Sequence, residues 1–273
     1  MSRLELLDVV KPVLMDGAMG TSLLAQGIPS HSCLEELNLT RPDLVYTIHK
    51  NYLEAGAKII VTNTFGANRP RLSERGKEGF LKRINVAGVR IVRKAADGKA
   101  YVLASVGPLG SIAQKMSVLD MKKNFEEQIK ALLEASPDGF LVETMVTIRE
   151  CEAALHAIRS LSKKALFALM TFPNKPKNIS DKAIKLTAKT LRAAGAHVLG
   201  INCVDPKETL SLFKKLKSCD DGPHCVRPSM GIPGHQVTSK EFAATSQKIM
   251  ELGCEWIGGC CGTTPDILKL LQK

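Results

Sequence analysis

The sequence lacks the features of a membrane-spanning or secreted protein. No apolar run approaches the roughly 20 residues that a helix needs to cross a bilayer. Two acidic side chains already occur within the first eight residues, and no cationic start is followed by an apolar centre, as it would be in a signal peptide. We therefore expect a cytoplasmic protein that makes no contact with a membrane.

Aromatic residues are also scarce. They make up 4% of the chain, with a single Trp, so we expect a core built mainly from aliphatic side chains. The hydrophobic share of 44% and the charged share of 24% are typical of soluble globular proteins. No linker, low-complexity tract or break in composition interrupts the 273 residues, so we predict a single domain over residues 1–273.

The net charge of +11 is not concentrated in any one segment. Basic pairs such as Lys122-Lys123 and Lys214-Lys215 lie in predicted helices, and no basic tail or interleaving of aromatic and basic residues occurs. Nucleic-acid binding is therefore not expected. Solvated helix faces explain the charge best, and a docking surface for an acidic protein is the second possibility.

Short aliphatic runs alternate with helical stretches along the whole chain. The runs predict strands at 13–15, 58–62, 101–106, 139–142, 165–170, 197–201, 224–227 and 254–258. Helical spacing predicts helices at 42–55, 78–96, 121–135, 148–161, 180–194, 207–216, 239–252 and 267–271. We expect Thr40 to cap the first helix, with Pro42 in its first turn and Gly195 ending the helix of 180–194.

Eight alternations predict an α/β fold, the (β/α)8 TIM barrel. A doubly wound open sheet is the alternative, but no Gly-x-Gly-x-x-Gly turn follows the first strand. Active sites of such barrels lie at the carboxyl ends of the strands. We therefore expect one face to gather the polar and thiol side chains that end predicted strands, which are Asp16, Asn63, Glu143, Cys203, Cys260 and Cys261.

The chain has eight cysteines, and without a signal peptide they favour a metal site or free thiols over disulfides. Cys203 ends one predicted strand, and Cys260 and Cys261 end another between glycines. Thiolates suit zinc, and catalytic zinc sites use three protein ligands and keep one position open. Buried hydrophobic packing is the alternative for such thiols. No ligand-like spacing connects these three to the remaining cysteines, which are Cys33, Cys151, Cys219, Cys225 and Cys254.

The other candidates allow two interpretations each. Asp16 and Gly17 form either a ligand contact or a plain turn. Glu143 follows four apolar residues, so its charge needs a partner, either a substrate ammonium or a rim salt bridge. Asn63 either orients a ligand or satisfies the backbone. We do not count His235 as a ligand, although the glycines beside it are compatible with a phosphate cradle.

Together, these motifs resemble those of the homocysteine S-methyltransferase family. The shared motifs are Asp-Gly-Ala-Met-Gly-Thr at 16–21, Thr-Asn-Thr-Phe at 62–65, Glu-Thr at 143–144, Asn-Cys at 202–203 and Gly-Gly-Cys-Cys-Gly-Thr-Thr-Pro at 258–265. The first two look most like the homocysteine-binding domain of cobalamin-dependent methionine synthase. The resemblance implies a barrel enzyme that methylates the thiolate of L-homocysteine to give methionine.

The resemblance also implies the roles of individual residues. It implies a zinc ion held by Cys203, Cys260 and Cys261, and binding of the amino-acid part of homocysteine by residues that include Asp16, Gly17 and Glu143. It leaves the methyl donor open among a methyl-corrinoid protein, S-methylmethionine, S-adenosylmethionine and betaine.

One position departs from the pattern of the subgroup, which tends to carry Pro-Asn-Ala-Gly where this chain has Pro-Ser-Met-Gly at 228–231. The Asn lies near the zinc in the family, so the fourth ligand of the resting site stays open. Two other functions also stay open at this stage. They are a non-catalytic, thiol-rich zinc-binding module and a phosphate-handling barrel enzyme with buried free cysteines.

Overall fold

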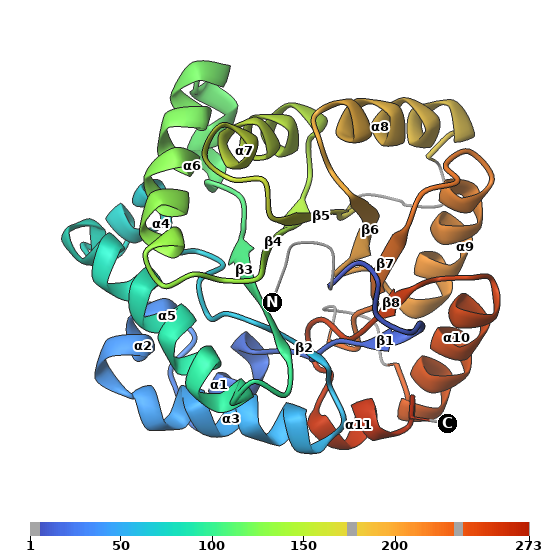
Figure 1. Ribbon diagram of the computed structural model, residues 1–273, viewed down its shortest axis with the longest axis horizontal. Coiled ribbons are helices and arrows are strands. Elements are labelled where there is room, and N and C mark those ends of the chain that lie inside the picture. Colours follow the sequence, from blue (N-terminus) through green and yellow to red (C-terminus); the bar gives the residue numbers. More distant parts are fainter. Residues whose placement is uncertain (1–5, 174–178, 232–236, 273) are drawn as a thin grey trace.

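The computed structural model describes residues 6–173, 179–231 and 237–272. Eight parallel strands form the centre of the molecule, and helices surround them as an outer layer (Figure 1). The strands are β1 Val13–Leu14, β2 Ile59–Val61, β3 Tyr101–Val106, β4 Gly139–Met145, β5 Ala165–Met170, β6 Val198–Asn202, β7 His224–Arg227 and β8 Trp256–Ile257.

The helices predicted from apolar spacing are all present. They are α3 Pro42–Glu54, α5 Leu81–Ala96, α6 Val118–Leu133, α7 Ile148–Leu161, α8 Asp181–Ala193, α9 Pro206–Lys217, α10 Ser239–Glu251 and α11 Pro265–Lys269. The shorter helical elements are α1 Gly20–Ala25, η1 Leu34–Glu36, α2 Leu37–Thr40, α4 Arg69–Ser73, η2 Glu78–Phe80 and η3 Ser111–Lys115. None of the helices in the described parts of the chain is long and apolar enough to span a membrane.

The eight strands close into a barrel. Each strand from β2 to β7 pairs with the strand that follows it in the chain, and β8 pairs with β1. The remaining gap between β1 and β2 is bridged by Met15 and Ile59. The Asp16 amide donates to the Ile59 carbonyl at 3.0 Å, and the Lys58 amide donates to the Leu14 carbonyl at 2.8 Å. This closure confirms the (β/α)8 prediction over an open sheet.

Two packed layers follow from the alternation of side chains along each strand. One cluster contains alternate strand residues such as Leu103, Leu141 and Phe167 and no helix residue, so it fills the barrel interior. The other joins the opposite strand faces to the surrounding helices. Phe167 and Trp256 meet edge to face inside the barrel with ring centroids 5.3 Å apart. Both layers are mainly aliphatic, as expected.

Local capping explains several helix ends. The N-cap of α8 is Ser180, whose side chain accepts a bond from the Ala183 amide. Gly195, with φ of 98°, follows the end of this helix, as predicted. The prediction for Thr40 is wrong. It is the last residue of α2 and donates to the Glu36 carbonyl, so Arg41 becomes the N-cap of α3.

Candidate active site

A cavity of about 350 Å³ opens at the carboxyl ends of the strands. All the residues predicted for the site line it, although they come from five different strands or the loops that follow them. They are Asp16, Gly17, Asn63, Glu143, Cys203, Cys260 and Cys261. The closed barrel therefore brings together groups that are distant in sequence, and one half of the cavity carries thiols while the other carries charges.

The thiol half consists of Cys203 after β6 and of Cys260 and Cys261 after β8. Their three Sγ atoms all lie within 4.8 Å of one another, and those of Cys203 and Cys261 are 3.9 Å apart. The Cys203 amide donates to the Arg227 carbonyl at 3.2 Å, and the Cys260 amide donates to the Pro228 carbonyl at 2.8 Å. Backbone bonds to the end of β7 thus hold the two thiol-bearing loops side by side.

Strained backbone also contributes to this geometry. Cys203 has φ of 58°, in the left-handed region that non-glycine residues rarely adopt. A Cβ added to Gly259 would lie 2.3 Å from Cβ of Thr263, so only glycine fits directly before Cys260. The glycine that precedes the thiol pair is therefore required by close packing.

The thiols influence one another's ionisation. Hydrogen bonds with Cys203 and Cys260 lower the pKa of Cys261 to about 3, whereas hydrogen bonds with Cys260 and Cys261 raise the pKa of Cys203. Cys203 lowers the pKa of Cys260, but the hydrogen bond with Cys261 and burial outweigh this effect and raise it to about 11. One thiolate is therefore favoured without a cation, because adjacent negative charges repel. A bound divalent cation would allow all three to ionise, so this donor set fits zinc.

Asn202, at the end of β6, links the thiol half to β4. Its Oδ1 accepts from the Thr144 amide at 2.9 Å, and its Nδ2 donates to Thr144 Oγ1 at 2.8 Å. Its Nδ2 also lies 3.9 Å from Cys260 Sγ. Between Val142 and Met145, β4 contains one residue more than the facing stretch of β5, and Thr144 has φ of 61°. The bulge extends β4 beyond its predicted end at residue 142.

The charged half centres on Arg227, the last residue of β7, which is 4% exposed. Its Nη2 donates to Asp16 Oδ1 at 2.8 Å, and its Nη1 lies 3.5 Å from Glu143 Oε2. Its Nε donates to the Gly259 carbonyl at 3.1 Å. One guanidinium therefore connects both predicted substrate carboxylates with the loop that carries the thiol pair.

Each carboxylate also accepts a bond from a neighbouring strand. Asp16 Oδ2 accepts from the Val61 amide at 2.7 Å, and Glu143 Oε1 accepts from the Ser105 hydroxyl at 2.6 Å. Burial raises the pKa of Asp16 to about 7, and it also raises that of Glu143, while the nearby Arg227 opposes both shifts. This cavity wall therefore favours additional positive charge, which would stabilise both ionised carboxylates.

Arg227 is a site residue that the motifs of the sequence do not single out. The available signal was its position, because it ends the predicted strand 224–227 and so lies at the face where polar strand ends were expected to meet. Burial lowers its pKa, but Asp16 and Glu143 raise it by more, so the guanidinium remains charged. The position at the carboxyl end of a predicted strand, which made Glu143 a candidate, therefore also makes Arg227 one.

Gly17 and Asn63 contribute in different ways. A Cβ on Gly17 would lie 2.6 Å from the Thr263 carbonyl oxygen and 2.8 Å from a ring carbon of Tyr52, so the chain needs glycine there. Asn63 Nδ2 donates to the Leu34 carbonyl at 2.8 Å and lies 3.1 Å from Asn38 Oδ1. The amide nitrogen of Asn63 thus holds the loop after β2 in place, as its backbone interpretation predicts.

Other residues named from the sequence lie as follows. Ser229, where the subgroup tends to have Asn, is buried, and its hydroxyl donates to the Cys261 carbonyl at 3.3 Å. His235 and most of the loop around it lie outside the described residues. Within the parts of the chain that are described, no other group of three or more Cys, His, Asp or Glu side chains has the spacing to hold a metal.

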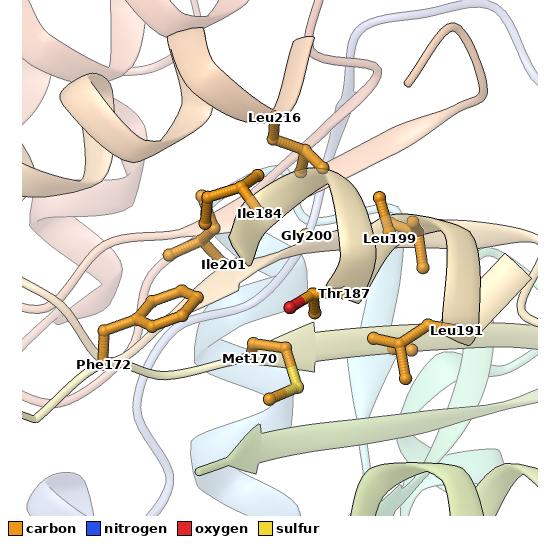
Figure 2. Close-up of a pocket in the computed structure, with 11 residues that line it drawn as sticks. Met170, Phe172, Ile184, Thr187, Leu191, Leu199, Gly200, Ile201 and Leu216 are labelled. Atoms are coloured by element: carbon orange, nitrogen blue, oxygen red, sulfur yellow. The ribbon is translucent and has the colours of Figure 1, made fainter. Parts of the chain in front are cut away.

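A second cavity, between α8 and the ends of β5 and β6, differs from the first. Its volume is about 20 Å³, and its walls are formed by apolar side chains such as Met170, Ile184 and Leu199 (Figure 2). The hydroxyl of Thr187, the one polar group labelled there, donates to the Ala183 carbonyl at 2.8 Å. This space is a packing void, because it offers no free polar group to a ligand.

Comparison with known proteins identifies relatives that match nearly the whole length of this chain. A methionine synthase from Mycobacterium tuberculosis is 31% identical over 96% of this chain, which spans 24% of that protein. Homocysteine S-methyltransferase 1 from Brassica oleracea var. italica is 26% identical over 95% of this chain and 92% of its own length. The crystal structure of the homocysteine methyltransferase MmuM from Escherichia coli, in its metallated form, superposes with a TM-score of 0.84. It is 25% identical and covers 99% of both chains.

The family description that matches this sequence, Homocysteine S-methyltransferase, extends over residues 13–273 and so includes every strand that contributes to the cavity. The chain therefore belongs to the homocysteine S-methyltransferase family.

Proposed function

We propose that this chain transfers a methyl group from an activated donor to the thiolate of L-homocysteine, giving methionine, and that it depends on zinc to do so. The observation that carries this proposal is the convergence of three Sγ atoms, all within 4.8 Å of one another, in the cavity that also contains Asp16 and Glu143. A thiol ligand set and an acidic wall in one pocket suit a substrate with a thiol at one end and an ammonium at the other.

In this reaction the chain binds and orients the substrate. Cys203, Cys260 and Cys261 would hold the zinc, which supplies a Lewis acid that keeps the substrate thiol deprotonated at neutral pH. An unbound thiol has a pKa of about 8.5 and would be mostly protonated there. The substrate sulfur forms a bond to the methyl carbon, and the pair of electrons in the broken bond leaves with the donor. No side chain has to act as a general base.

The other predicted residues recognise the amino-acid end. The carboxylates of Asp16 and Glu143 provide the negative charge that the ammonium requires. Gly17 allows the first loop to pack close to Thr263 and Tyr52, since any side chain would clash there. Asn63 lines the same cavity, and with its amide nitrogen engaged it would offer Oδ1 to a ligand.

For the donor we propose a methyl group carried by a separate corrinoid protein. The higher identity to a methionine synthase, 31% against 26% for the Brassica enzyme, supports this choice. The net charge of +11 provides attraction for an acidic partner protein. S-methylmethionine, S-adenosylmethionine and betaine are the alternatives.

A sequence of three measurements tests the proposal. Metal analysis of the purified protein should show one zinc per chain, and X-ray absorption at the zinc edge should show an added sulfur ligand when L-homocysteine is supplied. A panel of the four donor classes should then yield methionine from one of them. Zinc without a response to homocysteine would indicate a non-catalytic zinc module. Absence of stoichiometric zinc would indicate the phosphate-handling alternative.

A further inference from the structure

Arg227 lies where the substrate's polar end has to bind. It is buried, it lines the cavity, and its Nη2 and Nε atoms donate at 2.8 and 3.1 Å to Asp16 and to the Gly259 carbonyl. Nη1 differs, since the one contact it makes among the described residues is the 3.5 Å approach to Glu143. Charge-assisted hydrogen bonds are normally about 2.7–2.9 Å long. Nη1 is therefore a buried donor with unused capacity beside the cavity.

The charges of the wall lead to a requirement on the substrate. Asp16 and Glu143 supply two negative charges when ionised, and Arg227 supplies one positive charge, so the three groups together carry one negative charge. An amino acid brings one ammonium and one carboxylate. The ammonium matches the remaining negative charge, and the carboxylate needs a donor, because a buried charge without a partner is costly.

We propose that Arg227 is a specificity-determining residue that binds the carboxylate of the substrate through Nη1. Asp16 then holds the guanidinium in place, and Glu143, whose Oε2 has the longer contact with Arg227, takes the main share of the ammonium. This inference rests on the proposed function and deepens it, since it names the group that recognises the carboxylate of the amino-acid substrate. A thiol that lacks the carboxylate leaves Nη1 without its partner.

The competing role for Arg227 is charge balance alone, and a double variant separates the two. Asp16→Asn combined with Arg227→Gln removes one negative and one positive charge, so the wall keeps its net charge and loses the guanidinium. Arg192→Gln with Asp220→Asn is the matched control, because this half-buried ion pair, 2.6 Å apart, contributes no residue to the cavity. Arg227→Lys serves as the conservative single variant.

The test is calorimetric binding of two thiols to the zinc-containing protein, L-homocysteine and 3-aminopropane-1-thiol, which is the same molecule without the carboxylate. The wild type and the control pair should prefer L-homocysteine, and in the double variant that preference should fall about tenfold or more. Arg227→Lys should retain part of it. Unfolding temperature and zinc content, measured on each variant, verify that the site is assembled.

Three results would overturn the inference. A double variant with both the preference and the affinities of the wild type would assign Arg227 to charge balance. A double variant that loses affinity equally for both thiols, and so keeps the preference, would show that Arg227 does not recognise the carboxylate. A wild type that binds both thiols equally well would show that no group recognises the carboxylate. A zinc-containing wild type that binds neither thiol would instead remove the proposed function, and this inference with it.

Discussion

The two halves of the cavity differ in the source of the positive charge that balances their ionisable groups. The thiol half places three ionisable sulfur atoms within 4.8 Å of one another, and the nearby Arg227 guanidinium is already paired with Asp16. The charged half places two carboxylates around a guanidinium that already belongs to the protein. The first half therefore needs a cation from outside, and the second is compensated in part by its own guanidinium, which leaves one net negative charge. Experiments that remove one group at a time should distinguish them.

The largest effect is expected in the thiol half. Cys260→Ser should abolish both zinc retention and methyl transfer, because two remaining thiols are insufficient for a catalytic zinc site. Metal analysis and an assay of methionine formation measure the two losses. Cys219→Ser is the control, since this thiol lies outside the cluster and donates to the Leu216 carbonyl. A Cys260→Ser enzyme that is active without zinc would refute the ligand assignment.

Removing the positive charge of Arg227 should destabilise the protein through the charged half of the cavity. Arg227→Met leaves Asp16 and Glu143 buried without a counter-charge, and we expect the free energy of unfolding to fall by about 3–5 kcal/mol. Urea denaturation measures this loss. The pair Asp16→Asn and Arg227→Gln should lose less, because it leaves no additional uncompensated charge. If Arg227→Met unfolds at the same urea concentration as the wild type, the compensation described here is not required for stability.

A smaller perturbation tests the backbone that joins the halves. Gly259→Ala forces a Cβ to within 2.3 Å of Thr263, and overpacking of this kind costs about 1–3 kcal/mol. We expect a lower unfolding temperature and faster loss of zinc to a chelator, because the shifted loop carries Cys260. Gly79→Ala provides the control, since a Cβ there meets nothing within 4 Å. Equal zinc loss from both variants would show that the close packing does not position the thiols.

A further prediction concerns pH. Burial raises the pKa of Asp16 from 3.8 to about 7, so the folded state holds its proton more tightly than the unfolded state. The stability from this group is fully present below the ordinary pKa of 3.8 and is lost as the pH rises through about 7. Asp16→Asn removes this component. The unfolding free energy of the variant should therefore depend less steeply on pH in this range, and parallel curves would contradict the assignment.

Much of the barrel could be predicted from local patterns. Aliphatic runs and helical spacing depend on neighbouring residues, so they located all eight strands and the main helices. Short elements such as α1 and α4 were missed, because six and five residues are too few to establish a period. Thr40 was misassigned as a cap because it belongs to α2, one of these short helices.

The candidate site also contains some residues that local patterns predict and others that they do not. The thiols, Asp16 and Glu143 were found because each ends an apolar run, and strand ends of a parallel barrel meet at one face. The pairing of Arg227 with Asp16 was not found, since the two are 211 positions apart and no local pattern connects them. The bulge that extends β4 was also missed, because it depends on register with β5.

The sequence by itself determined which residues form strands and helices, and which reactive side chains follow the strands. The tertiary structure alone decided which charges face one another and which donor atoms remain unused. The physical reason is that strand and helix formation depends on residues a few positions apart. Burial and charge compensation depend on groups that closure of the barrel brings within a few ångströms, whatever their distance along the chain.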